Sequence, residues 1–265
     1  MDLVSIDLSM ALTDAQVERY ARHILLPEIG GAGQAKIQAA KVLVVGAGGL
    51  GTPVIQYLAA AGIGTIGIID DDVVDLSNLQ RQVIHSTSNI GMAKVQSAKA
   101  AVADINPDVV INAHQTRLTA DNAGDIISQY DIVADGCDNF ETRFLVMDTC
   151  YLEKKTLVSG AILRFDGQLS VFKPHERSDH NHPCYRCLYP KAPPPDMIPT
   201  CAEAGVLGAL CGAIGSLQAA EVLKEITGAG ESLSGSLIIF DGLRTEFRKI
   251  KIKPDPKCSL CGSAD

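Results

Sequence analysis

The sequence contains no tryptophan, and aromatic residues make up only 5% of it. It also has no excess of positive charge, because 23 Lys and Arg residues face 31 Asp and Glu residues, for a formal net charge of -8. A protein that binds nucleic acid without regard to sequence presents a basic stripe or patch. We therefore expect no nucleic-acid partner.

Long apolar runs are missing as well. No segment approaches the roughly 20 consecutive apolar residues that a membrane helix requires. The first residues carry Asp2, Asp7, Asp14 and Glu18 and lack the basic region of a signal peptide. We expect a soluble, cytoplasmic protein without a membrane partner.

The composition is otherwise that of a folded domain. With 265 residues, 46% of them hydrophobic, the chain is not generally disordered and needs no disulfide bonds to fold. Its eight cysteines, in a reducing compartment, are expected to be metal ligands, nucleophiles or core residues.

Short apolar runs alternate with helical segments in the first 161 residues. The pattern predicts strands at 42–45, 65–69, 109–113, 132–134 and 156–161. It predicts intervening helices at 34–40, 49–61, 94–105, 120–129 and 140–153. Such alternation is typical of a doubly wound α/β fold with a mostly parallel sheet.

The rhythm changes in the second half. Alternating segments at 168–173, 236–240 and 245–252 predict antiparallel strands that extend the sheet, the first after an Asp166-Gly167 turn. A long helix is expected over 206–226, after a proline-rich stretch at 174–200 without predicted structure. We expect one domain, 1–265, composed of a helical arm (13–40), a nucleotide-binding half (41–161) and a remaining part (162–265).

A glycine-rich loop follows the first predicted strand. Residues 46–51 fit G-x-G-x-x-G through Gly46, Gly48, Gly49 and Gly51, which lets backbone N–H groups approach a phosphate. Asp70 follows the next strand, where a carboxylate can accept ribose hydroxyls. The loop alone does not separate a dinucleotide from ATP. An NAD(P)-dependent oxidoreductase and a non-catalytic scaffold therefore stay open as alternatives.

Further polar residues follow the other strands of this half. Asn78, Arg81 and Lys94 come after the second strand, and Asp138 and Asn139 come after the fourth. Two cations and a carboxylate beside a nucleotide suit triphosphate chemistry, in which the α-phosphate is neutralised and Mg²⁺ is held.

These segments resemble the MoeB/ThiF family of ubiquitin-activating-enzyme-like adenylyltransferases. The resemblance rests on the Val-Val-Gly-Ala-Gly-Gly-Leu-Gly run, Ser-Asn-Leu-Gln-Arg-Gln at 77–82, Gly-x-x-Lys at 91–94 and Asp-Asn-x-x-x-Arg at 138–143. It implies a Rossmann-like fold and ATP-dependent adenylation of the C-terminal glycine of a ubiquitin-like sulfur carrier, with release of pyrophosphate. The pattern at 215–221 favours a MoaD-like carrier of molybdenum cofactor biosynthesis, and a ThiS-like carrier of thiamine biosynthesis is the alternative.

The resemblance also implies roles for single residues. Asp70 would hold the ribose, Asp138 would position Mg²⁺-ATP, and Arg22 would reach into the partner's site of a homodimer. The implied ATP-binding set is Gly46, Gly48, Gly49, Gly51, Asp70, Asn78, Arg81, Lys94, Asp138 and Asn139. Because the chain ends four residues after Cys261, a separate sulfurtransferase is expected to supply the sulfur.

The cysteines divide into groups. Two C-x-x-C pairs, Cys184/Cys187 and Cys258/Cys261, could bind one Zn²⁺ with four thiolates or form two redox dithiols, and the resemblance implies a structural zinc site. Cys201 precedes the long predicted helix, and either a covalent link to the activated carrier or an auxiliary role is open for it. Small core residues are expected at Cys137, Cys150 and Cys211, and hydrogen-bonded scaffold roles at His23 and His85.

Overall fold

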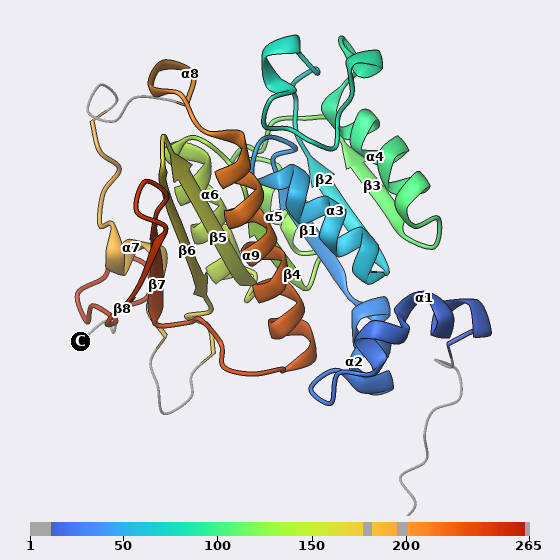
Figure 1. The fold of residues 1–265 in the computed structure, drawn as a ribbon. Coiled ribbons are helices and arrows are strands. Elements are labelled where there is room, and N and C mark those ends of the chain that lie inside the picture. Colours follow the sequence, from blue (N-terminus) through green and yellow to red (C-terminus); the bar gives the residue numbers. More distant parts are fainter. Residues whose placement is uncertain (1–11, 177–181, 195–200, 263–265) are drawn as a thin grey trace, which may run out of the picture.

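The computed structural model describes residues 12–176, 182–194 and 201–262, without the side chains of Cys201 and Ala202. One eight-stranded sheet runs through this part of the chain in the order β3-β2-β1-β4-β5-β6-β7-β8 (Figure 1). The strands are β1 (Lys41–Val45), β2 (Thr65–Ile69), β3 (Val110–His114), β4 (Ile132–Asp135), β5 (Thr156–Leu163), β6 (Asp166–Phe172), β7 (Ser236–Asp241) and β8 (Glu246–Lys251).

The half of the sheet from β3 to β5 is parallel, as the sequence predicts. In β1, Val42 and Val44 join the core on one face, whereas Leu43 and Val45 join the core on the other. Helices α3 (Gly51–Ala61), α4 (Lys94–Ile105) and α9 (Gly208–Thr227) lie over the first face, and α5 (Ala123–Ile127) and α6 (Phe140–Leu152) lie over the second. Burial on both faces explains why these strands are continuously apolar.

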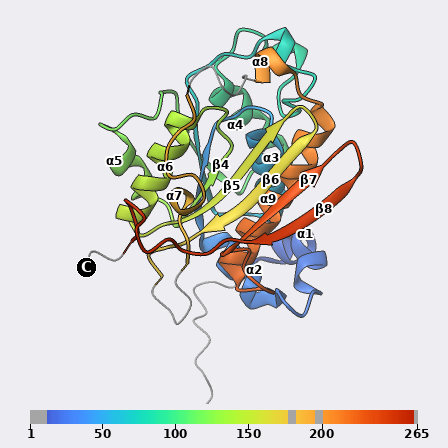
Figure 2. The same ribbon diagram turned by 90° about the vertical axis from the view of Figure 1, so that its left-hand side faces the viewer.

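The half from β5 to β8 is antiparallel, which confirms the predicted extension of the sheet. Figure 2 shows these strands from the side, with β8 at the edge and the chain beyond it running back toward α7 (Tyr185–Leu188). Helix α7 lies within the stretch 174–200, for which the sequence predicted no structure. The helix α8 (Cys201–Ala204) follows directly after this stretch.

The N-terminal arm consists of α1 (Asp14–Ile24) and α2 (Gly30–Ala39). A capping box begins α1, because Thr13 and Gln16 exchange side-chain to backbone hydrogen bonds. The predicted start of the second helix at residue 34 is wrong, since α2 begins at Gly30. A Cβ on Gly33 would lie 2.9 Å from the Ile29 side chain, just before the helix, so the tight entry into α2 favours glycine at this position.

Two other local predictions need correction. The helix expected over 120–129 spans only Ala123–Ile127, because the Asn122 side chain bonds Thr119 and Arg117 in a turn before it. The hairpin turn is not formed by Asp166 and Gly167, which lie within β6.

The hairpin turns instead at Arg164 and Phe165, because Leu163 pairs with Asp166 and Arg164 has a φ of 55°. A Cβ on Gly167 would lie 2.5 Å from Ile214 of α9, so packing rather than turn geometry requires this glycine. Among the described residues, no helix combines the length and the apolar character needed to cross a membrane.

Candidate active site

The glycine-rich loop joins β1 to α3 at the point where the chain passes from one side of the sheet to the other, between β1 and β4. Ligands of open α/β sheets bind at such switch points. Gly46 has a φ of +90°, which side chains rarely tolerate. A Cβ on Gly51 would lie 1.8 Å from the Gly46 carbonyl oxygen, so the loop closes tightly only with glycine there.

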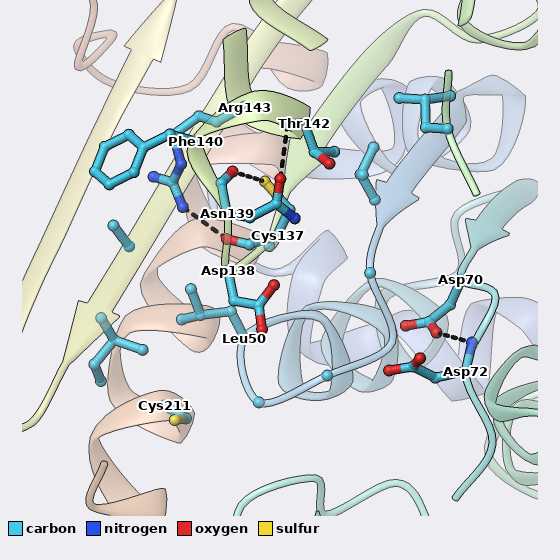
Figure 3. Close-up of a pocket in the computed structure, with 18 of the residues that line it drawn as sticks. Leu50, Asp70, Asp72, Cys137, Asp138, Asn139, Phe140, Thr142, Arg143 and Cys211 are labelled. Atoms are coloured by element: carbon cyan, nitrogen blue, oxygen red, sulfur yellow. Dashed lines mark hydrogen bonds between the residues drawn. The ribbon is translucent and has the colours of Figure 1, made fainter. Parts of the chain in front are cut away.

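A cavity of about 660 Å³ opens above this loop. Its lining includes all but two of the predicted active-site residues within the described side chains: Gly46, Gly48, Gly49, Asp70, Asn78, Arg81, Lys94, Asp138 and Asn139. Figure 3 shows Asp70 and Asp72 on one side of the glycine loop and Asp138 with Leu50 on the other. The cavity thus brings together residues from three separate βα connections.

Asp70 is fixed by the backbone at the carboxyl end of β2. One carboxylate oxygen accepts from Ala47 N–H at 2.7 Å, and the other accepts from Asp72 N–H at 2.9 Å. The side chain is therefore oriented before any ligand binds. Its remaining lone pairs face the cavity and can accept hydroxyl groups.

The two predicted cations both line the cavity. The Arg81 guanidinium donates to the Ser77 carbonyl at 3.0 Å. The Lys94 ammonium pairs with the Asp72 carboxylate at 2.7 Å, and the Lys94 side chain is only 7% exposed. A phosphate group entering the cavity would meet both cations among the residues that line it.

Asp138 lies on the loop after β4 and is exposed to the cavity. Within the described part of the chain its carboxylate has no hydrogen-bond or ion-pair partner, so it is available to a ligand or a cation. The neighbouring Asn139 caps α6 by accepting from Thr142 N–H at 2.8 Å. Asn139 thus has a structural role besides lining the cavity.

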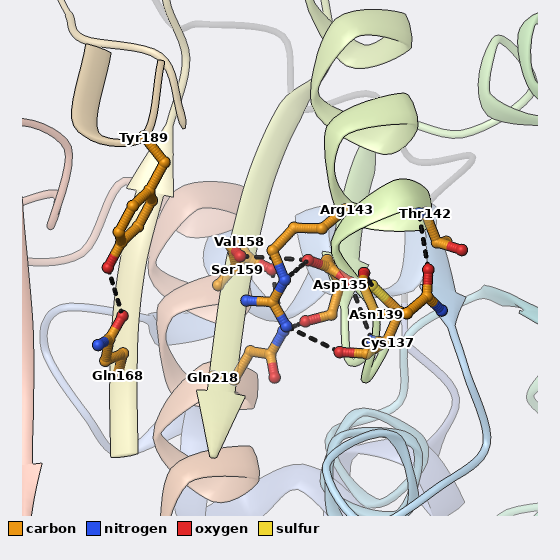
Figure 4. A network of polar contacts seen from close by, with 10 residues as sticks. All are labelled: Asp135, Cys137, Asn139, Thr142, Arg143, Val158, Ser159, Gln168, Tyr189 and Gln218. Atoms are coloured by element: carbon orange, nitrogen blue, oxygen red, sulfur yellow. Dashed lines mark hydrogen bonds and ion pairs between the residues drawn. The ribbon is translucent and has the colours of Figure 1, made fainter. Parts of the chain in front are cut away.

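A buried polar network beneath this loop was not predicted (Figure 4). The Asp135 carboxylate accepts from Cys137 N–H and from the Ser159 hydroxyl. Arg143 lies 3.6 Å from Asp135 and donates to the Cys137 carbonyl at 2.7 Å. From α9, Gln218 donates to the carbonyls of Asp135 and Val158. The network fixes the loop that carries Asp138. Of the residues in this network, only Arg143 belongs to a motif noted in the sequence, Asp-Asn-x-x-x-Arg at 138–143.

His85 supports the glycine loop from behind. Its ring bonds the Ala47 carbonyl at 3.0 Å and the Ser97 hydroxyl at 2.8 Å. These partners assign the proton to Nε2 and leave Nδ1 as an acceptor. Burial lowers the pKa of His85, and the nearby Lys94 lowers it further. The His85 ring is therefore a neutral scaffold group. His23 also has the predicted hydrogen-bonded scaffold role, because its ring bonds the Gln34 side chain at 3.2 Å.

Three predicted site residues lie elsewhere. Gly51 belongs to the first turn of α3 and does not line the cavity. Arg22 is an exposed residue of α1, which packs where α3 ends and β2 begins, so it does not line its own chain's cavity. Cys201 begins α8 rather than directly preceding α9, and its side chain lies outside the described residues. The core positions of Cys137, Cys150 and Cys211 are confirmed.

Both C-x-x-C pairs meet in one cluster on the second face of the sheet, where α7 packs beside α6. The sulfur atom of Cys184 lies 3.8 Å from that of Cys187 and 3.5 Å from that of Cys258. The sulfur atom of Cys187 lies 3.4 Å from that of Cys261. All four ligand atoms are within 4.8 Å of one another. Thiolates on a tetrahedral zinc are about 3.8 Å apart, given bonds of about 2.3 Å. The cluster therefore could hold a metal such as zinc. Two independent redox dithiols would not require the two pairs to lie next to each other.

The fold and the cavity define an α/β protein with a Rossmann-like parallel half and a glycine loop at its switch point. The model of the family described as the ThiF family matches residues 20–260. The chain belongs to the ThiF family, which confirms the expected family.

Curated relatives are similar over almost the whole chain. A "Sulfur carrier protein adenylyltransferase" of Thermus thermophilus is 48% identical over 96% of this chain and 93% of its own length. The "Probable adenylyltransferase/sulfurtransferase MoeZ" of Mycobacterium tuberculosis is 49% identical over 95% of this chain. The mouse "Adenylyltransferase and sulfurtransferase MOCS3" is also 49% identical over 95% of it. The chain spans 64% of MoeZ and 54% of MOCS3.

Solved structures share the fold at lower identity. Escherichia coli MccB, crystallised with AMPCPP and MccA, aligns with a TM-score of 0.81 at 22% identity, covering 95% of this chain and 75% of the other. The structure of PaaA aligns with a TM-score of 0.78 at 21% identity, over 95% of this chain and 78% of that one. The sheet and its covering helices are thus a known arrangement.

Proposed function

We propose that this chain is an adenylyltransferase that transfers AMP from ATP to the C-terminal glycine of a ubiquitin-like sulfur carrier. The observation that carries the proposal is the cavity at the switch point. It gathers a glycine loop, a ribose-side carboxylate, two cations and an unpartnered carboxylate. Three relatives that match 95% or more of the chain are named adenylyltransferases, which supports the same activity.

The chemistry needs positioning and charge rather than a protein nucleophile. The carrier's terminal carboxylate is ionised at neutral pH and attacks the α-phosphorus. A bond forms between carboxylate oxygen and phosphorus, the bond to the β-phosphate oxygen breaks, and pyrophosphate leaves. We assign Arg81 and Lys94 to the phosphate charge that repels the nucleophile, and Asp70 to the ribose.

Asp138 is assigned to the metal that accompanies ATP. An exposed carboxylate without a protein partner offers the oxygen ligand that Mg²⁺ prefers. When bound, Mg²⁺ would supply positive charge to the phosphates of ATP. The loop that carries Asp138 would hold that cation beside the glycine loop.

The zinc site, the homodimer and the identity of the carrier are also proposals. We propose a structural zinc on the four cysteines, because the spacing of the four sulfurs suits a closed thiolate shell. A homodimer, in which Arg22 enters the partner's cavity, accords with the position of Arg22 outside its own. A MoaD-like carrier is favoured over a ThiS-like carrier. The cytoplasmic location, the separate sulfurtransferase and a covalent role of Cys201 stay predictions.

An exchange assay tests this proposal and names the carrier. The chain is incubated with Mg²⁺, ATP, radiolabelled pyrophosphate and either a MoaD-like or a ThiS-like carrier. We expect label in ATP only when a carrier with an intact terminal glycine is present, and more with the MoaD-like one. A carrier truncated by its last residue is the matched control. Absence of exchange with every intact carrier would overturn the proposal.

A further inference from the structure

The cavity has a second wall that the nucleotide-binding residues do not use. It is formed where β5 and β6 meet α7, and it is lined by Ala161, Leu163, Gln168, Tyr185 and Tyr189. Arg81 and Lys94 come from the connection after β2, whereas the charged residues beside this wall are Asp166 of β6 and the buried Arg143. The amide and hydroxyl groups of Gln168 and Tyr189 suit the backbone of an extended peptide.

One hydrogen bond organises this wall. The Tyr189 hydroxyl donates to Oε1 of Gln168 at 3.1 Å, which fixes the orientation of the amide (Figure 4). Within the described residues, Nε2 of Gln168 has no partner. An amide N–H₂ held at a cavity wall can donate to a peptide carbonyl. Because its rotamer is already fixed, less side-chain freedom is lost on binding.

Tyr189 is itself held by α7. Its ring centroid lies 5.0 Å from that of Tyr185, and its N–H donates to the Tyr185 carbonyl at 2.8 Å. Tyr185 is 4% exposed and packs edge-on against Phe144 and Phe172. The position of the Tyr189 hydroxyl therefore depends on the position of α7 and on the packing of Tyr185 against Phe144 and Phe172.

The four-cysteine cluster determines where α7 lies. Cys184 directly precedes the helix and Cys187 belongs to it, and their sulfur atoms meet those of Cys258 and Cys261 from the C-terminal segment. The backbone N–H of Asp255 also donates to the Cys187 sulfur at 3.4 Å. Four residues of helix would have little stability of their own. Their position depends on this attachment and on the Tyr185 packing.

We infer that Gln168, oriented by Tyr189, recognises the backbone of the carrier's C-terminal tail, and that the four-cysteine cluster positions this pair. The inference rests on the proposed function and adds to it a recognition element for the peptide. In this account the cluster contributes to carrier binding as well as to folding. ATP binding, which we assign to the glycine loop and to the connection after β2, is independent of it.

The first test measures KM for the carrier and KM for ATP in carrier-dependent exchange. Tyr189→Phe keeps the ring but removes the hydroxyl. We expect KM for the carrier to rise roughly 2- to 10-fold, the range of one hydrogen bond, with KM for ATP and metal content unchanged. Tyr57→Phe, at an exposed tyrosine of α3, is the matched control and should change neither constant.

A double variant separates positioning from direct contact. If Tyr189 acts through Gln168, then Tyr189→Phe should add nothing to the effect of Gln168→Ala. Additive effects of the two substitutions would overturn the inference, and so would an unchanged KM for the carrier in Tyr189→Phe. In either case, exchange by the unmodified chain would still support the proposed function. Lack of exchange by the unmodified chain with every carrier would overturn both.

The role of the cluster is tested with Cys261→Ser and hydrogen exchange. We expect this variant to lose metal, to exchange the Tyr189 amide faster, and to raise KM for the carrier at least as much as Tyr189→Phe. Binding of ATP, followed by calorimetry, should be retained. A metal-free Cys261→Ser variant with unchanged KM for the carrier would contradict the inference.

Discussion

The guanidinium of Arg143 lies 3.6 Å from the carboxylate of Asp135, and the two side chains are 9% and 0% exposed. Arg143 also donates to the Cys137 carbonyl, one residue before Asp138. The pair therefore joins α6 and β4 to the loop that carries Asp138. The role of this pair is to position the carboxylate of Asp138, which itself has no partner in the described part of the chain.

Removing Arg143 should destabilise the fold. In Arg143→Ala the buried Asp135 charge loses its partner, which costs about 3–5 kcal/mol in comparable sites. Urea unfolding measures the change. Arg248→Ala, at an exposed ion pair, is the control and should stay within about 0.5 kcal/mol of the unmodified chain. A loss below about 1 kcal/mol for Arg143→Ala would show that the pair does not hold the loop.

Lys94 should be required for catalysis but not for folding. We expect Lys94→Ala to lower kcat for carrier adenylation by about 10²–10³, because a buried cation aimed at the phosphates is lost. Lys99 lies on the same helix and is exposed, so Lys99→Ala is the matched control and should retain full activity. Steady-state kinetics decide between them. Equal activity of the two variants would remove Lys94 from the site.

Sequence reasoning found the residues whose chemistry and neighbours lie close together in the chain. The glycine loop and Asp70 each follow an apolar run, so their placement at the carboxyl end of the sheet could be predicted. The same holds for Arg81 and Lys94, which lie in the connection after β2. Continuous apolar strands with helices between them likewise determine the parallel half of the sheet.

Tertiary pairing explains what the sequence did not reveal. Gln218 lies 83 residues from Asp135, and no local pattern joins them. The glycines at the start of α2 have low helix propensity and suggest a break, yet the helix begins at Gly30 and packs against α9. Helix α7 was missed because its position depends on cysteines 74 residues away.

The stability of the fold should depend on the protonation of His85. Burial lowers its pKa in the folded chain below the value of about 6.5 in the unfolded chain. Between the two values the unfolded chain binds more protons, so the free energy of unfolding falls as the pH drops below about 6.5. Above that pH the contribution is complete.

Urea unfolding between pH 5 and pH 8 checks this dependence. His85→Gln removes the titrating group, so its free energy of unfolding should change less with pH than that of the unmodified chain. Because His114 and His175 also have lowered pKa values through burial, a smaller dependence should persist in the variant. Identical slopes for the two proteins would contradict the assignment.

The four-cysteine cluster should bind one zinc ion per chain. Elemental analysis after gentle purification is expected to find that ratio in the unmodified chain and to find the metal lost in Cys258→Ser. Cys150→Ala, at a buried cysteine outside the cluster, should keep its zinc and controls for the loss of a thiol. Well under one zinc in the unmodified chain would count against the site.

The most direct test of the central claim is carrier-dependent exchange of radiolabelled pyrophosphate into ATP by the unmodified chain and by Asp138→Ala. Asp138 is exposed and lacks protein partners among the described residues, so the substitution should leave the fold intact. Circular dichroism and the urea midpoint confirm this. We expect exchange in the unmodified chain and none in Asp138→Ala. Retained exchange in the folded Asp138→Ala variant would contradict it.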